Sequence, residues 1–199
     1  MNDRWDRALL TDGFFAEDEA ELVRDEVRRL PKDATLLEVG SYRGRSSQFI
    51  LASMTEEQEL VCIDTFRSAA SYGGHSYADL RDTLNDPRAT VLPMSLRAAF
   101  RHLRGKGFSL ALIDADHSYA GAVEDLCLVI ALAASGSTLL CHDVDEELFP
   151  GVVAAIESLV TRQILETGPQ VGTLGSFTVR GRPTWLLDPG VFRDEELPI

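Results

Sequence analysis

Two short segments in the second half of the chain hold most of the side chains that could do chemistry. The first has the sequence IDADHSY and contains Asp114 and His117. The second has the sequence CHD and contains His142 and Asp143. If the two segments follow adjacent parallel strands, Asp114 and Asp143 lie close enough to share a cation. Two carboxylates favour Mg²⁺, whereas an imidazole ligand from His142 would shift the preference toward Mn, Fe, Co, Ni or Zn.

The other residues of these segments have competing interpretations. His117 is placed to take a proton from a substrate, and its ordinary pKa suits a general base near neutrality. His142 is explained equally well as a metal ligand or as a hydrogen-bonded structural histidine. Asp116 fits the acid at the start of a helix better than a ligand. Cys141 and His142 do not make a nucleophile–base pair, because neighbouring residues of a strand point to opposite faces.

A glycine turn earlier in the chain, LLEVGSYRGRSS, has the features of a ligand-binding loop. Gly40 and Gly44 allow a tight turn from strand to helix and close contact between backbone and ligand. The spacing matches neither a dinucleotide-binding loop nor a P-loop, which disfavours pyrophosphate and triphosphate ligands. Glu38 adds a carboxylate that suits a cationic or hydroxyl-bearing ligand. Asp64, one unit later, can accept two hydrogen bonds from a ribose.

Three further side chains near these segments are less informative. Tyr42 lies inside the glycine turn and could line either the turn's ligand site or the acidic site. His75 lies in the stretch SYGGHS, which is best explained as a plain loop. His102 is expected to be solvated, at the end of a helix rich in arginine.

The elements that must position these residues alternate between short apolar runs and amphipathic segments, which is typical of a parallel α/β sheet. Strands are predicted at Thr35–Val39, Leu60–Ile63, Thr90–Met94, Ser109–Ile113 and Thr138–Cys141. Helices are predicted at Asp18–Leu30, Arg45–Met54, Tyr77–Leu84, Leu96–Leu103, Ser118–Ala134 and Phe149–Thr161. Two further strands, roughly Ile164–Val171 and Leu174–Val179, form an antiparallel pair at the sheet edge. The polar residues named above follow the carboxyl ends of the strands, where ligands bind in open α/β sheets.

Composition limits the classes of partner. The 199-residue chain has 19 basic and 32 acidic residues, a net charge of −13, which disfavours nucleic acid. The three cysteines, in apolar surroundings, indicate buried thiols in a reducing compartment. No signal peptide is visible and the longest uncharged run is interrupted by polar residues, so we expect a cytoplasmic protein that does not enter a membrane.

The motifs resemble a known family. LLEVGSYRGRSS resembles the first motif of class I S-adenosylmethionine-dependent methyltransferases. IDADHSYAGAVEDL followed by LLCHDVD resembles the metal-dependent O-methyltransferase branch, which includes catechol, caffeoyl-CoA and macrolide-sugar O-methyltransferases. The resemblance extends from about Asp12 to Val179. It implies an α/β, Rossmann-like three-layer sandwich whose seven-stranded, mostly parallel sheet ends in an antiparallel hairpin. The chain would be one domain, with a helical segment at 1–33, a cofactor-binding core at 34–180 and a tail at 181–199.

The resemblance also implies roles for individual residues. His117 takes the place of the catalytic base, and His142 stands where many relatives carry a carboxylate, which puts the metal's identity and the need for one in question. Metal ligands would be Asp114, His142 and Asp143. Residues around S-adenosylmethionine would be Glu38, Gly40, Ser41, Gly44 and Ser46 at its methionine part, Asp64 at the ribose and Thr65, Phe66 and Ser95 near the adenine, with Tyr42 and Asp114 beside them.

The resulting functional prediction is O-methylation of a small hydroxylated molecule, with S-adenosylmethionine as cofactor. A divalent cation, Mg²⁺ in preference to Mn²⁺ or another ion, would assist at Asp114, His142 and Asp143. One alternative is a metal-assisted hydrolase or oxygenase on the same scaffold. Another is a non-catalytic module that binds S-adenosylmethionine. Neither a nucleic-acid partner nor a membrane partner is expected, and a homodimer is compatible with the sequence.

Overall fold

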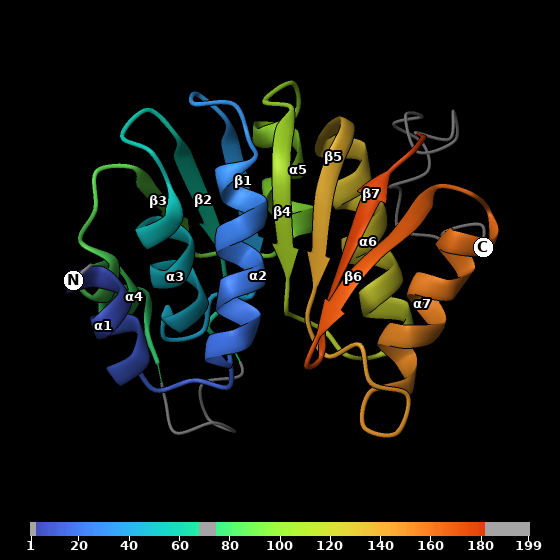
Figure 1. Cartoon of the computed structure of the whole chain (residues 1–199), viewed down its shortest axis with the longest axis horizontal. Coiled ribbons are helices and arrows are strands. Elements are labelled where there is room, and N and C mark those ends of the chain that lie inside the picture. Colours follow the sequence, from blue (N-terminus) through green and yellow to red (C-terminus); the bar gives the residue numbers. More distant parts are fainter. Residues whose placement is uncertain (1–2, 68–74, 182–199) are drawn as a thin grey trace.

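A computed structural model describes residues 3–67 and 75–181, in which a seven-stranded sheet lies between two layers of helices (Figure 1). The strand order is β3-β2-β1-β4-β5-β7-β6. The strands are β1 (Thr35–Val39), β2 (Glu59–Ile63), β3 (Ala89–Leu92), β4 (Phe108–Ile113), β5 (Ala133–Cys141), β6 (Leu165–Val171) and β7 (Leu174–Val179). Strands β1 to β5 pair in parallel, and β7 pairs antiparallel with both β5 and β6. The predicted fold class, including the reversed terminal hairpin, is confirmed.

Helices cover both faces of the sheet, and each face has its own apolar core. The helices are α1 (Asp3–Leu10), α2 (Glu17–Arg28), α3 (Arg45–Ser53), α4 (Tyr77–Leu84), α5 (Leu96–Leu103), α6 (Tyr119–Leu132) and α7 (Pro150–Thr161). Helices α1 to α4 contribute buried side chains to the core on one face, and α5 to α7 contribute to the core on the other. Because both faces are covered, the central strands are continuous apolar runs instead of alternating ones.

Serine residues are the N-caps of three helices that follow the strand ends. The hydroxyl of Ser76 accepts a hydrogen bond from the backbone N–H of Asp79 at the start of α4. Ser95 and Ser118 cap α5 and α6 in the same way. A capping hydroxyl satisfies one of the N–H groups that the first helical turn leaves free. These caps fix where the loops at the carboxyl edge of the sheet end and the helices begin.

The structure differs from the predicted elements mainly at α6 and β5. Helix α6 ends at Leu132, two residues early, and β5 begins at Ala133 instead of Thr138. The predicted strand leaves out the polar residues before Thr138, which the structure includes in β5. They are accommodated by an irregular register against β4, with Gly136 at a φ of 77°. Sequence patterning also did not delimit α1. The strand predicted for β3 starts one residue late and ends two residues late.

Parts of two predicted regions lie outside the described residues. These are most of the loop before Tyr77 and the tail after residue 181. In the described part of the chain, no helix has both the length and the apolar composition needed to cross a membrane. The parallel strands end at a common edge, at the bottom of Figure 1, and this edge carries the residues that the sequence singled out.

Candidate functional site

The glycine turn after β1 lies directly against the segment that follows β4. Gly40 has a φ of 87°, and a Cβ atom there would overlap the carbonyl oxygen of Asp114. The backbone is tied on both sides, since the Asp114 N–H donates to Val39 O at 2.8 Å and the Gly40 N–H donates to Ile63 O at 2.8 Å. Only glycine fits both the backbone conformation and the close approach. The turn and the acidic segment are therefore neighbours.

Glu38 lies beneath the turn and has no exposed surface. Its carboxylate accepts hydrogen bonds from the hydroxyls of Ser41 at 2.6 Å, Ser46 at 2.7 Å and Ser47. Burial raises the pKa of Glu38, and the serine hydrogen bonds oppose that rise. The hydroxyls of Ser41 and Ser46 thus satisfy the buried carboxylate, and the carboxylate satisfies the two hydroxyls. The placement of these side chains around the methionine part of the cofactor stays a prediction.

Asp64, at the end of β2, holds the same turn from the other side. One oxygen of its carboxylate accepts the N–H groups of Ser41 at 3.1 Å and Tyr42 at 2.8 Å, and the other accepts that of Phe66 at 2.6 Å. Tyr42 and Phe66 both have positive φ angles, of 46° and 55°. The hydrogen bonds hold these two unfavourable conformations in place. Asp64 therefore shapes the turn as well as lying where a ribose was expected.

His75 is packed against Asp64, although the sequence indicated only a plain loop. Its side chain is 1% exposed, and its Nε2 lies 3.7 Å from Asp64 Oδ1. The ring sits 4.7 Å from that of Tyr42 and 5.4 Å from that of Phe66, measured between centroids. Neither ring nitrogen has a hydrogen-bond partner among the described residues. Buried polar atoms without partners are uncommon, and they often mark a place where a ligand or water binds.

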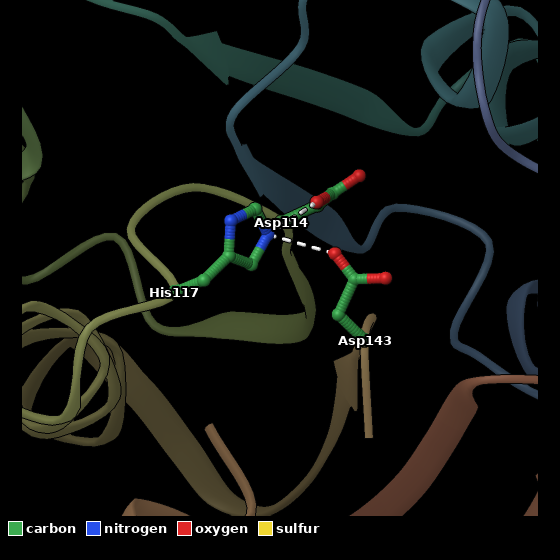
Figure 2. Close-up of side chains that lie close together, drawn as sticks. All are labelled: Asp114, His117 and Asp143. Atoms are coloured by element: carbon green, nitrogen blue, oxygen red, sulfur yellow. Dashed lines mark ion pairs between the residues drawn. The ribbon is translucent and has the colours of Figure 1, made fainter. Parts of the chain in front are cut away.

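An acid–histidine cluster occupies the edge next to the turn (Figure 2). Ligand atoms of Asp114, His117 and Asp143 lie within 4.8 Å of one another. His117 Nε2 is 2.7 Å from Asp143 Oδ2 and 3.6 Å from Asp114 Oδ1, and both carboxylates turn toward it. His142 approaches the same pair of acids, with Nδ1 3.2 Å from Asp143 Oδ1 and 3.7 Å from Asp114 Oδ2. Two carboxylates thus lie between two imidazoles.

The charged groups of the cluster strongly shift one another's pKa values. Hydrogen bonding to Asp114 and Asp143 raises the pKa of His117 to about 9. Burial lowers the pKa of His142, but the carboxylates of Asp143 and Glu19 outweigh burial and bring it to about 10. Burial raises the pKa of Asp143, but the two histidines outweigh it and hold the pKa well below its usual range. In the ligand-free chain the two imidazoles are therefore cationic at neutral pH and balance the acids.

His142 has a third carboxylate neighbour that the sequence did not reveal. Its Nε2 lies 3.1 Å from Oε2 of Glu19, on α2, and the two residues are 123 positions apart in the sequence. Glu19 also accepts hydrogen bonds from the Thr173 N–H at 2.9 Å and the Thr173 hydroxyl at 3.0 Å. The ring of Phe15 stacks on the imidazole at 5.2 Å. His142 is thus held on several sides, while its Nδ1 faces the acids.

The remaining predicted residues lie at or near the same edge in different settings. Gly44 begins α3 at a φ of 87°, and a Cβ there would press on the Leu80 side chain, so it packs against α4. Thr65 and Ser95 are exposed, and Ser95 caps α5. Asp116 is exposed and accepts the Ser118 N–H at 2.8 Å, as expected of an acid at a helix start.

Comparison with known proteins assigns the family. The family model described as a methyltransferase domain matches residues 37–144, more than half of the chain. The chain belongs to the methyltransferase domain family. The expectation of a class I S-adenosylmethionine-dependent methyltransferase is confirmed. No curated protein shows a significant sequence match to this methyltransferase.

Solved structures share the fold over nearly the whole methyltransferase. An O-methyltransferase from Bacillus cereus, in complex with SAH, has a TM-score of 0.68 at 13% identity, covering 89% of this chain and 90% of that one. The O-methyltransferase TomG from Streptomyces achromogenes, involved in tomaymycin synthesis and in complex with SAM, has a TM-score of 0.64 at 19% identity, covering 90% of each chain. The SAH-bound methyltransferase PaMTH1 from Podospora anserina has a TM-score of 0.68 at 14% identity, covering 90% and 86%. At these identities the similarity concerns the fold.

The sequence analysis did not predict two residues of this methyltransferase site, Glu19 and His75. Only Glu19 has a feature in the sequence that could have identified it. Glu19 lies on the apolar face of α2, one turn before Leu22 and Val23, and a charged residue on a buried stripe indicates a buried partner. His75 left no such signal, because its burial depends on Tyr42 and Phe66, which come from other loops.

Proposed function

We propose that this methyltransferase transfers the methyl group of S-adenosylmethionine to a hydroxyl oxygen of a small molecule, with a divalent cation held by Asp114 and Asp143. The observation that carries the proposal is the close approach of Gly40 to Asp114. This approach puts a turn of the kind that binds the cofactor next to acids and an imidazole that can orient and deprotonate an alcohol. Both halves of the reaction would then share one edge of the sheet.

The residues at the turn fit the cofactor. S-adenosylmethionine, when bound, supplies a methyl group on a positively charged sulfur. The edge carries acids, in accord with a cationic ligand, and the turn lacks the spacing that holds pyrophosphate. The Gly40 backbone would approach the methionine part, and Asp64 would hold the ribose with His75 beside it. The unpartnered nitrogens of the buried His75 side chain are where such a ligand could form hydrogen bonds.

The acid–histidine cluster fits a cation and a base together. Carboxylates of Asp114 and Asp143 are suitable ligands for a divalent ion, and both face one point beside His117. His117 is partly exposed, which leaves its ring accessible to an acceptor hydroxyl. A pKa of about 9 keeps its imidazole protonated at neutral pH in the ligand-free chain. Its role as a base therefore requires that Asp114 and Asp143 neutralise another cation instead.

Ligand binding and turnover test the proposal in one preparation of the full chain. Thermal unfolding is measured with S-adenosylmethionine and with S-adenosylhomocysteine, each with Mg²⁺, Mn²⁺ or a chelator. We expect both nucleosides to raise the midpoint, since a ligand of the native state stabilises it by mass action. Turnover is then measured as transfer of a labelled methyl group to a panel of catechols and other hydroxylated small molecules. The measurement is made with and without chelator.

The outcomes separate the alternatives. If neither nucleoside binds, the cofactor is wrong and a metal-assisted hydrolase or oxygenase becomes the better interpretation. If both bind without turnover on any acceptor, the chain is a binding module. Transfer to amines alone would exclude the hydroxyl acceptor. Asp143→Asn should lower turnover by about 10²-fold or more while nucleoside binding persists, and the matched control is Glu146→Gln, an exposed acid on the same loop.

The proposal also covers the cellular compartment of the protein, which we infer from its cysteines. The three cysteines, Cys62, Cys127 and Cys141, are all free and buried. Burial raises the pKa of Cys127 to about 11, which keeps its thiol protonated and unreactive. Such thiols fit a reducing compartment, and we place the methyltransferase in the cytoplasm on that basis.

A further inference from the structure

The ring of His142 is fixed from the side away from the acids, and Glu19 is the residue that fixes it. The Glu19 carboxylate is buried, and its Oε1 accepts both hydrogen bonds from Thr173. Its Oε2 accepts the Ala16 N–H at 2.9 Å and lies 3.1 Å from His142 Nε2. Every oxygen of the side chain is engaged, so its position is determined by α2 and by the turn between β6 and β7.

A fixed carboxylate determines which nitrogen of the imidazole carries the proton. Glu19 can only accept at Oε2, so Nε2 keeps its hydrogen whether the ring is cationic or neutral, and Nδ1 is the nitrogen that gives up its proton when a cation binds at the acids. The Phe15 ring, inclined by 26° to the imidazole plane, packs against it. Nδ1 faces the two acids, 3.2 Å from Asp143 Oδ1 and 3.7 Å from Asp114 Oδ2.

The Nδ1 atom has the properties of an available ligand. The His142 side chain is 5% exposed, and its Nδ1 has only the two acids, Asp114 and Asp143, as charged neighbours on that side of the ring. A carboxylate on one ring nitrogen with the other nitrogen facing acids is the arrangement in which histidines bind metal ions. Glu19 comes from a helix before the sheet begins, so it is distinct from the strand-end acids that would hold the ion.

We propose that Glu19 is a positioning residue that makes His142 a nitrogen ligand, so that the cation site at Asp114 and Asp143 prefers Mn²⁺ and similar ions over Mg²⁺. The inference rests on the proposed function, which assumes a cation at these acids. Mg²⁺ binds oxygen ligands in strict octahedral geometry, whereas Mn²⁺, Fe²⁺, Co²⁺ and Zn²⁺ accept imidazole. The competing interpretation is that Glu19 and His142 only tie α2 to the sheet.

Metal affinity, measured by binding and not by turnover, distinguishes these two interpretations of Glu19. Calorimetric titration of the full chain with Mn²⁺ and with Mg²⁺ gives the ratio of the two dissociation constants, and Co²⁺ adds a visible spectrum that reports nitrogen ligation. We expect wild type to bind Mn²⁺ at least about tenfold more tightly than Mg²⁺. Glu19→Gln should weaken Mn²⁺ binding by about 10–100-fold, the range for removing such a partner.

Two further variants make the test specific. His142→Gln replaces the imidazole by an amide whose N–H group can still face Glu19 and that has no counterpart of Nδ1, so the preference for Mn²⁺ should disappear while the fold is kept. Glu26→Gln is the matched control, because it makes the same change on the same buried face of α2, where Glu26 pairs with Arg29 at 2.8 Å. It should leave the ratio unchanged.

Three results would overturn the inference. The first is equal affinity of wild type for Mn²⁺ and Mg²⁺, and the second is an unchanged ratio in His142→Gln. The third is a loss of Mn²⁺ binding in Glu26→Gln as large as in Glu19→Gln, which would show a general effect of the helix. If wild type binds S-adenosylhomocysteine but no divalent ion, both this inference and the cation in the proposed function fail. If it binds ions without preference, only this inference fails.

Discussion

Glu38 shows that a charged residue at a strand end can stabilise the turn that follows the strand. Its carboxylate is buried with the hydroxyls of Ser41, Ser46 and Ser47 around it. Glu38→Ala would leave three buried hydroxyls without their acceptor, and we expect the free energy of unfolding to fall by about 2–4 kcal/mol. Urea denaturation measures this. Glu59→Ala, at the exposed start of β2, should change it by less than about 0.5 kcal/mol, and an equal loss in both variants would contradict the expectation.

His75 provides the second prediction at this scale. His75→Phe keeps an aromatic ring between Tyr42 and Phe66 but removes both ring nitrogens. If those nitrogens bind the cofactor, the dissociation constant for S-adenosylhomocysteine should rise by about 5–20-fold, which corresponds to one or two hydrogen bonds. Calorimetry measures it, with His102→Ala on the exposed side of α5 as control. An unchanged affinity would mean that His75 only packs.

At the scale of elements, the glycine turn is held where it is by its contact with the neighbouring strand end. Gly40 and Gly105 share a φ of 87°, but a Cβ at Gly40 would overlap Asp114 while one at Gly105 meets nothing within 4 Å. Both alanine variants carry the cost of a left-handed residue, about 1 kcal/mol. Gly40→Ala adds the steric overlap.

We therefore expect Gly105→Ala to lose about 1 kcal/mol of unfolding free energy and Gly40→Ala to lose at least about 3 kcal/mol. Gly40→Ala should also abolish the thermal shift with S-adenosylhomocysteine, because the turn and Asp114 would move apart. Chemical denaturation and thermal shift on the two purified variants provide the comparison. Similar losses in the two would show that the backbone conformation alone, and not the close approach, requires glycine at position 40.

The N-terminal helices are a second element-scale feature of the site. The guanidinium of Arg45, at the start of α3, donates hydrogen bonds to the carbonyl oxygens of Leu9 at 3.0 Å, Thr11 at 2.8 Å and Phe15 at 2.7 Å. This clamp holds the segment between α1 and α2, which carries Phe15, against the first helix after the glycine turn. The segment before the sheet thereby supplies the ring that packs on His142, and the first turn of α2 supplies Glu19.

For the whole molecule, an acidic balance and buried acids make stability depend on pH. Asp125 is partly buried on α6, and burial, followed by the charges of Glu124 and Asp116, raises its pKa to about 7. The folded chain holds this proton more tightly than the unfolded chain. The free energy of unfolding should therefore fall as the pH rises from about 4 to about 7 and then stay level with respect to this group.

Asp125→Asn removes that dependence. At pH 8 the variant should be more stable than wild type by about 1–2 kcal/mol, after allowance for the partial exposure of the side chain. Near pH 4 the two should be nearly equal. Unfolding curves at several pH values measure the difference, and a gap that does not change with pH would contradict the assigned cause.

The order and type of most elements follow from the sequence because they depend on local patterns. The strands β1 and β7 and the helices α4 and α5 have the predicted bounds, since each has a clear apolar period and a turn or cap signal at its end. The position of the chemistry also follows, because side chains after successive parallel strands must meet at one edge. Asp114, His117 and Asp143 meet there.

The surroundings of those side chains required the tertiary structure. The three serine hydrogen bonds of Glu38 depend on how the turn folds back over the strand, and the position of the His142 ring depends on a glutamate 123 positions away. Sequence periodicity reports the neighbours of a residue along its own helix or strand. Contacts between elements depend on how helices and loops pack on the sheet, so Glu19 and His75 become part of the site only in the folded chain.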